Sequence, residues 1–297
     1  MADIELYYQE RNPSPLQLVW FAFKRRLAPM ISLWLLASLL VLVILAPVIT
    51  PYSANVQFVD AISLPPSWTN EGNMQFLFGT DDLGRDLLSR LLIGGRFSFG
   101  LPIIIVVLAS TVGIFIGAMV GADTQSKLRV LGRTLDRLLT IPSFLLALVL
   151  IAILGAGLGN AIIAITLSLI PQFIYVTRNA VYQEWQKDYV TASRLNGCSN
   201  TYLMYRVILP NITPTLVMQL TVALSVAIMD IAALSFLGLG VQSPTPEWGS
   251  MLARSLDEVY LSPWSMVLPG LSLFVTIMAI NVVGDSLRRA IKQRMDT

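Results

Sequence analysis

Histidine is absent from this chain of 297 residues, and cysteine occurs only once, at Cys198. The absence of histidine excludes imidazole acid–base catalysis and histidine-ligated metal sites, and a single cysteine excludes an internal disulfide. Charge is also scarce, because 13% of the residues are charged, whereas a soluble domain contains about 25%. The net charge of +2 gives no indication of a nucleic-acid partner, and none is expected.

The phosphate-binding loop of ATPases is missing as well. That loop has the pattern Gly-x-x-x-x-Gly-Lys-Ser/Thr, and none of the four lysines follows a glycine: Lys24, Lys127, Lys187 and Lys292. The chain is therefore not expected to hydrolyse ATP itself. We predict no catalytic residue, no metal site and no cofactor.

Hydrophobic residues, by contrast, make up 55% of the chain and are gathered in long runs without charge. These runs are Leu27–Ile49, Phe97–Ala122, Leu138–Thr177, Val207–Met229 and Val259–Gly284. A transmembrane helix needs about 20 apolar residues, so the runs predict membrane spans. As one helix the third run would be about 60 Å long, twice the bilayer core, and it must fold back at the glycine-rich segment 155–160.

The runs predict an all-α polytopic membrane protein with six transmembrane helices. We expect a cytoplasmic segment 1–26, a membrane domain 27–285 and a cytoplasmic tail 286–297. The predicted spans are about 27–49, 97–122, 138–154, 161–177, 214–239 and 263–281, with a cytoplasmic loop at 178–213. Basic residues support this topology, because each of the four predicted cytoplasmic segments holds four of them and all outer loops together hold four.

The outer loop 51–96 ends in a segment with helical periodicity. Thr80 or Asp81 is a suitable N-cap, and five leucines fall on one face: Leu83, Leu87, Leu88, Leu91 and Leu92. Asp86 and Arg90 are spaced as an i,i+4 ion pair on the opposite face. This pattern predicts an amphipathic helix at the outer membrane–water interface.

The loop 178–213 has a helical pattern of its own. Val190, Arg194 and Leu195 share one helix face, and Gly197 follows as a stop signal. A second short helical pattern, Thr201–Ile208, ends at Pro210. The loop is therefore predicted to be a helix–turn–helix element on the cytoplasmic side.

Three glycines in the second span repeat every four residues: Gly113, Gly117 and Gly121. Such a stripe lets another helix approach closely. The partner is either another subunit or bundle, or a helix of the same chain, and the sequence favours neither.

The cytoplasmic loop resembles one found in membrane subunits of ABC importers, written Glu-Ala-Ala, three residues, Gly, nine residues, Ile-x-Leu-Pro. Here Thr191-Ala192-Ser193, Gly197 and Val207-Ile208-Leu209-Pro210 stand at those places, with Thr191 replacing glutamate and Val207 replacing isoleucine. The resemblance implies a coupling helix that docks into a groove of the ATPase subunit. It assigns this role to Tyr189, Thr191, Ala192, Ser193, Arg194, Gly197, Leu209 and Pro210.

The outer loop carries a more specific resemblance. It contains Gly-Thr-Asp, two residues, Gly-Arg-Asp, two residues, Ser-Arg, with Gly79, Thr80, Asp81, Gly84, Arg85, Asp86, Ser89 and Arg90 at those places. This pattern is similar to the second (C-type) subunit of the dipeptide and oligopeptide permeases. Similarity extends to 230–238, 244–249 and 284–288. Residues 8–11 and 64–68 are most similar to the dipeptide and Sap (antimicrobial-peptide uptake) members.

The resemblance implies a multi-pass permease subunit of an ATP-driven peptide importer in the bacterial inner membrane, forming half of the translocation pore. The implied partners are a second permease subunit in a heterodimer, two cytoplasmic ATPase subunits, an extracytoplasmic substrate-binding protein and a peptide substrate. Asp230 lies in the predicted fifth span. It is expected either to pair structurally with an outer-loop arginine such as Arg85 or Arg254, or to face the pore and attract cationic peptide termini.

The main alternative is a secondary transporter or channel driven by an ion gradient. Such proteins use intramembrane carboxylates and inverted repeats, but Asp230 is the only acid predicted within a span and the two halves show no repeat. A membrane-embedded enzyme is less favoured, because clustered histidines or paired carboxylates within the spans are missing.

Overall fold

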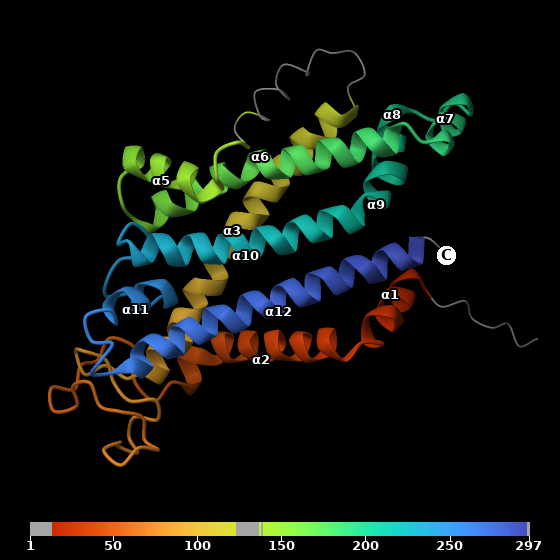
Figure 1. Ribbon diagram of the computed structural model, residues 1–297. Coiled ribbons are helices and arrows are strands. Elements are labelled where there is room, and N and C mark those ends of the chain that lie inside the picture. Colours follow the sequence, from red (N-terminus) through yellow and green to blue (C-terminus); the bar gives the residue numbers. More distant parts are fainter. Residues whose placement is uncertain (1–13, 123–136, 138, 296–297) are drawn as a thin grey trace, which may run out of the picture.

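The computed structural model describes residues 14–122, 137 and 139–295, which form helices joined by turns and loops, without a β-strand among them. Four long helices lie roughly side by side: α2 (Leu27–Ile49), α6 (Leu158–Trp185), α10 (Thr213–Phe236) and α12 (Pro263–Met295). A fifth long helix, α3 (Leu87–Ala122), crosses them (Figure 1). The predicted all-α fold is confirmed.

The shorter helices lie at the two ends of this bundle. They are α1 (Pro15–Lys24), α5 (Ser143–Leu154), α7 (Asp188–Leu195), α8 (Asn200–Leu203), the π-helix η1 (Met204–Ile208), α9 (Leu209–Asn211) and α11 (Trp248–Arg254). In Figure 1, α1, α7, α8, α9 and the C-terminal end of α12 are at one end, and α11 and the long loop before α3 are at the other. We refer to these as the inner end and the outer end, following the predicted topology.

Five of the described helices are long and apolar enough to cross a membrane: α2, α3, α6, α10 and α12. α5, which lies in the predicted third span 138–154, is apolar but has only 12 residues. It is the shortest of the helices at the predicted spans, and the first residue of that span, 138, lies outside the described residues. Three helices extend beyond the predicted spans, because α3 begins at Leu87, α6 continues to Trp185 and α12 continues to Met295. Hydropathy marks the apolar part of a helix, whereas backbone hydrogen bonding continues through polar turns at its ends.

The predicted amphipathic outer helix is not a separate element. Thr80 and Asp86 form an isolated bridge that closes a turn, and the helix begins at Leu87 as the first turn of α3. Neither Thr80 nor Asp81 is its N-cap. Within the turn, Gly84 has a φ of +71°, a left-handed conformation that a continuous helix does not contain.

The predicted ion pair between Asp86 and Arg90 is also wrong. Asp86 caps α3 instead, because its Oδ2 accepts hydrogen bonds from the backbone N–H of Ser89 at 2.8 Å and from the Ser89 hydroxyl at 2.6 Å. Arg90 turns towards Asp81, with Nε 3.4 Å from Oδ2.

The glycine stripe of α3 packs against α6 of the same chain. A Cβ atom added to Gly113 would lie 2.3 Å from Cβ of Phe173, and one added to Gly117 would lie 2.7 Å from Cβ of Thr177. The two backbones therefore approach more closely than any side chain at these positions permits. Of the two partners left open by the sequence, the structure shows a helix of the same chain.

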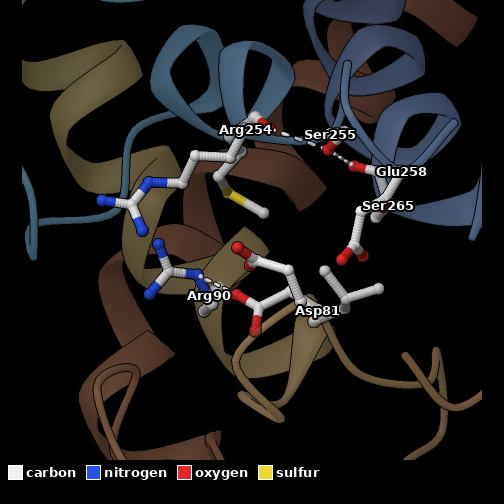
Figure 2. Close-up of a pocket in the computed structure, with 9 residues that line it drawn as sticks. Asp81, Arg90, Arg254, Ser255, Glu258 and Ser265 are labelled. Atoms are coloured by element: carbon white, nitrogen blue, oxygen red, sulfur yellow. Dashed lines mark hydrogen bonds and ion pairs between the residues drawn. The ribbon is translucent and has the colours of Figure 1, made fainter. Parts of the chain in front are cut away.

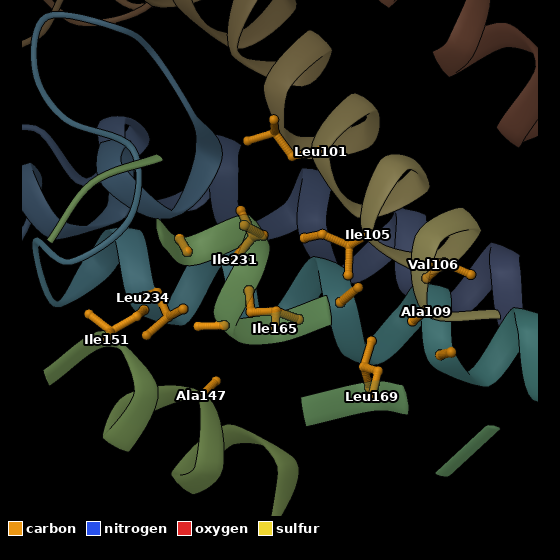
Figure 3. Close-up of a cluster of buried hydrophobic side chains, with 14 of the residues drawn as sticks. Leu101, Ile105, Val106, Ala109, Ala147, Ile151, Ile165, Leu169, Ile231 and Leu234 are labelled. Atoms are coloured by element: carbon orange, nitrogen blue, oxygen red, sulfur yellow. The ribbon is translucent and has the colours of Figure 1, made fainter. Parts of the chain in front are cut away.

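Next to this contact lies the main apolar core, which α3, α5, α6 and α10 share (Figure 3). Ile105, Ile165 and Leu234 are completely buried there. Lipid is as apolar as these side chains, so close packing rather than exclusion of water holds the helices together.

Replacing Gly117 by leucine should separate α3 from α6. Overpacking a tight contact costs about 1–3 kcal/mol or more, so we expect a lower thermal unfolding temperature for the purified protein in detergent. Gly100→Leu on the same helix is the control, because a Cβ at that position would have no neighbour within 4 Å in the described part of the chain. Equal unfolding temperatures for the two variants would contradict the packing role of the stripe.

Candidate functional site

The outer-loop motif builds a tight turn. One carboxylate oxygen of Asp81, Oδ1, accepts the backbone N–H groups of Leu83 at 3.0 Å and Arg85 at 2.9 Å. Gly84 completes the turn, where an added Cβ would lie 2.1 Å from the carbonyl oxygen of Phe58. The motif therefore positions the preceding loop against the start of α3.

A buried network of charges lies inside this turn. Arg85 and Arg90 are each only 2% exposed, and Nη2 of Arg85 lies 2.7 Å from Oδ2 of Asp81. Arg90 also donates from Nη1 to the carbonyl oxygen of Ala54 at 2.9 Å, which ties the loop to α3. Buried charges are tolerated when they are paired and hydrogen-bonded, and here Asp81 pairs with both arginines and accepts a hydrogen bond from Nε of Arg85 at 2.7 Å.

The two outer loops meet at a small cavity lined by this network (Figure 2). Its volume is about 20 Å³, the space that one buried water needs. Arg254 and Glu258 contribute from the second outer loop, and Glu258 accepts a hydrogen bond from the Ser63 hydroxyl at 2.9 Å. Burial, followed by the charge of Asp81, raises the pKa of Asp82 at this cavity.

Glu247, to which sequence reasoning gave no role, fastens α11 to α3. The residue is completely buried, and its carboxylate accepts the backbone N–H of Ser250 at 3.0 Å and the hydroxyl of Ser98 at 2.9 Å. Ser98 in turn accepts the backbone N–H of Trp248 at 3.0 Å. Burial raises the pKa of Glu247, and these hydrogen bonds oppose the rise. In the usual capping box, a serine or threonine N-cap is followed three residues later by a glutamate. Here the order is reversed, with Glu247 as the N-cap and Ser250 three residues later, and this spacing was the sequence signal for the start of α11.

Neutralising Asp81 should destabilise the outer end. Asp81→Asn leaves two buried arginines without their shared carboxylate, and breaking a buried ion pair costs about 3–5 kcal/mol. We expect a marked fall in the thermal unfolding temperature. Asp60→Asn is the control, because Asp60 is an exposed acid of the same loop. Similar temperatures for both variants would contradict a structural role of the network.

At the inner end, α7 projects from the bundle (Figure 1). Val190 is completely buried, whereas Leu195 is 85% exposed, so the predicted common face of Val190 and Leu195 is wrong. Arg194 lies with its guanidinium carbon 4.5 Å from the ring centroid of Trp185, a cation–π contact with the last turn of α6. Thr191 and Ala192 are exposed to solvent.

Gly197 ends α7 as predicted. Its φ is +83°, its N–H donates to the carbonyl oxygen of Arg194 at 2.9 Å, and the Cys198 N–H donates to that of Ser193 at 3.2 Å. This pair of bonds is a Schellman motif, in which glycine is strongly favoured. Among the described residues, no atom of another part of the chain lies within 4 Å of an added Cβ, so the requirement for glycine comes from the backbone conformation.

The structure separates the predicted coupling residues into two groups. Leu209 and Pro210 lie in α9, at the start of α10, where Leu209 packs against a small core that includes Val181 and Trp185. The second helical segment also continues past Pro210 to Asn211. Tyr189 is on α7, but its hydroxyl points back to Glu184 on α6.

Asp230 lies on α10 and is only 6% exposed. Its Oδ2 atom has no hydrogen-bond partner within the described part of the chain. The expected ion pair with an outer-loop arginine is not formed there, because Arg85 pairs with Asp81 and Asp82 and Arg254 makes no ion pair with Asp230. Sequence spacing could not show that Asp81 and Asp82 already pair with Arg85.

Comparison with known proteins adds to this geometry. Residues 113–297 match the family described as binding-protein-dependent transport system inner membrane component, and residues 14–66 match the N-terminal transmembrane domain of oligopeptide transport permease C. The peptide transport system permease protein SapC of Escherichia coli O6:H1 is 41% identical over 96% of this chain and 97% of that protein. The di/tripeptide transport system permease protein DppC of Pseudomonas aeruginosa is 42% identical over 95% and 93%.

Among solved structures, an inward-facing conformation of the MetNI methionine ABC transporter has a chain with a similar fold. The TM-score is 0.57 at 20% sequence identity, and the match covers 69% of this chain and 97% of that one. At this level of identity the likeness concerns the fold alone.

Proposed function

Because this chain belongs to the binding-protein-dependent inner membrane components, we propose that it is the second (C-type) permease subunit of an ATP-driven peptide importer. It is a multi-pass protein of the inner membrane. In the proposed complex it forms half of the translocation pore with a related permease subunit, and two cytoplasmic ATPase subunits supply the energy. An extracytoplasmic binding protein delivers the peptide to the outer loops.

The observation that carries this proposal is the exposure of α7. This eight-residue helix stands off the bundle and exposes most of its side chains to solvent, which leaves them available to a partner protein. It carries Ala192 of the coupling pattern and is followed by the pattern's Gly197, with Thr191 in place of the glutamate, and it lies at the inner end, where a cytoplasmic ATPase would dock. Peptide as the substrate is supported by the names of relatives that match along almost the whole chain.

Within this function the outer-loop motif has a structural role. The Asp81 carboxylate pairs with Arg85 and Arg90, and Arg90 also bonds to the loop backbone, so these buried groups hold the loop against α3. We assign Asp230 to a structural role as well, because its burial inside one subunit keeps the carboxyl away from the surface that substrate would touch.

Gly197→Val should uncouple the ATPase subunits from the membrane subunits. A residue with a Cβ costs about 1–2 kcal/mol in this conformation, and a β-branched residue costs more, so the end of α7 should refold and present a different surface. We expect normal membrane insertion, poor retention of ATPase subunits in a pull-down, and loss of uptake of a labelled dipeptide.

Gly197→Asn is the matched control, because asparagine adopts the left-handed conformation more readily than other residues with a Cβ. It should retain most ATPase binding and uptake. If Gly197→Val itself binds ATPase and transports normally, α7 is not the coupling helix.

The energy source separates this proposal from the ion-gradient alternative. In proteoliposomes that contain the whole complex and its binding protein, dipeptide uptake should require ATP on the cytoplasmic side. Uptake should continue when a protonophore collapses the proton gradient. Uptake that needs the gradient and ignores ATP would instead support a secondary transporter.

A further inference from the structure

The hydroxyl of Tyr189 lies where three helical segments meet. It donates a hydrogen bond to Oε1 of Glu184, in the last turn of α6. It also accepts a hydrogen bond from Nδ2 of Asn211, in α9, at 3.0 Å. A single oxygen on α7 is thus bonded to the end of one long helix and to the segment that leads into another. We propose that Glu184, Tyr189 and Asn211 form a joint that transmits movement of α7 to α6 and α10.

The glutamate in this joint is held firmly. Glu184 is 8% exposed, and Lys187 lies against it with Nζ 2.8 Å from Oε2. The lysine side chain is 55% exposed, so this ion pair with the α7 N-cap adds little stability. Lys187 also donates to Oε1 at 3.0 Å, the oxygen that accepts from Tyr189, and only the Tyr189 hydroxyl carries this contact on to Asn211 among the described residues.

The tyrosine remains a donor under physiological conditions. Burial, followed by the hydrogen bond to Glu184, raises the pKa of Tyr189 to about 12. The hydroxyl consequently keeps its proton near neutral pH, while its lone pairs stay available to Asn211. A hydrogen bond to a charged acceptor is stronger than one between neutral groups. This strength suits a contact that must persist while α7 moves.

The joint has a counterpart at the other end of α7. Arg194 stacks on Trp185, the residue directly after Glu184, so α7 is attached to the last turn of α6 near both of its ends. Between them Val190 is completely buried. With these contacts α7 moves with the inner end of α6 as one body, and Asn211 extends this connection to the start of α10.

The geometry assigns Glu184 and Asn211 to positioning rather than to docking. Glu184 is buried, and Asn211 lies on a different element from the exposed side of α7. Loss of the joint should leave the docking helix in place and weaken only the transfer of its movement. This inference rests on the proposed function, and its test must separate transmission from docking.

The first test uses Asn211→Leu in the complete complex, reconstituted with its binding protein and a labelled dipeptide. ATPase subunits should be retained at the wild-type level. Dipeptide uptake per ATP hydrolysed should fall about fivefold, the effect of losing one typical hydrogen bond. Tyr202→Phe is the control, because Tyr202 is a 54% exposed tyrosine of the same loop and its hydroxyl makes no hydrogen bond within the described residues. It should leave the ratio unchanged.

A double-mutant cycle tests whether the three residues act as one unit. Tyr189→Phe removes the shared hydroxyl and should lower the same ratio at least as far as Asn211→Leu does. Adding Asn211→Leu to Tyr189→Phe should then have no further effect, because the bond that Asn211 makes is already gone.

Three results would overturn the joint: an unchanged ratio in Asn211→Leu, effects that multiply in the double variant, or loss of ATPase subunits from Asn211→Leu. The last of these would place Asn211 in the docking surface. A wild-type complex that retains no ATPase would contradict the proposed function instead, and the two failures are therefore distinguishable.

Discussion

Close contact between the backbones of α3 and α6 is the constraint on which the rest of the structure depends. At Gly113 and Gly117 the helices approach within a distance that any side chain would prevent. Once α6 is fixed there, its outer end meets the loop after α10 through a bond from the Gly157 N–H to the Leu239 carbonyl at 3.0 Å, and its inner end carries Glu184 and Trp185. In a membrane, where apolar side chains gain nothing by leaving lipid, such contacts are a principal means of specifying one arrangement.

Polar groups then organise the two ends of the bundle in different ways. At the outer end, buried ion pairs and the capping carboxylate of Glu247 tie two loops to α3 and leave few unsatisfied charges. At the inner end, α7 is attached by the Tyr189 hydroxyl, the buried Val190 and the stacked guanidinium of Arg194, and most of its other side chains stay in solvent. The outer end is therefore held together by buried polar contacts, whereas the inner end leaves most of α7 exposed to solvent.

Local patterns in the sequence predicted the elements that depend on local physics. The apolar runs gave the long helices, and the glycine after a short helical pattern gave the stop at Gly197. The ion pair between Asp86 and Arg90 was wrong because it assumed a helix that Gly84 interrupts. The bond between Ser98 and Glu247 joins residues 149 positions apart, and the place of Asn211 beside Tyr189 likewise depends on how the loop folds back. Neither contact can be predicted from the periodicity of the sequence.

The continuity of α6 makes it a lever. Its 28 residues form one helix, about 42 Å long at 1.5 Å per residue. A tilt of about 5° about the inner end would move the outer end by roughly 4 Å over that length. A hydrogen bond needs a donor–acceptor distance of about 3.2 Å or less, so a displacement of this size away from Leu239 would break the 3.0 Å bond from the Gly157 N–H at the far end of α6.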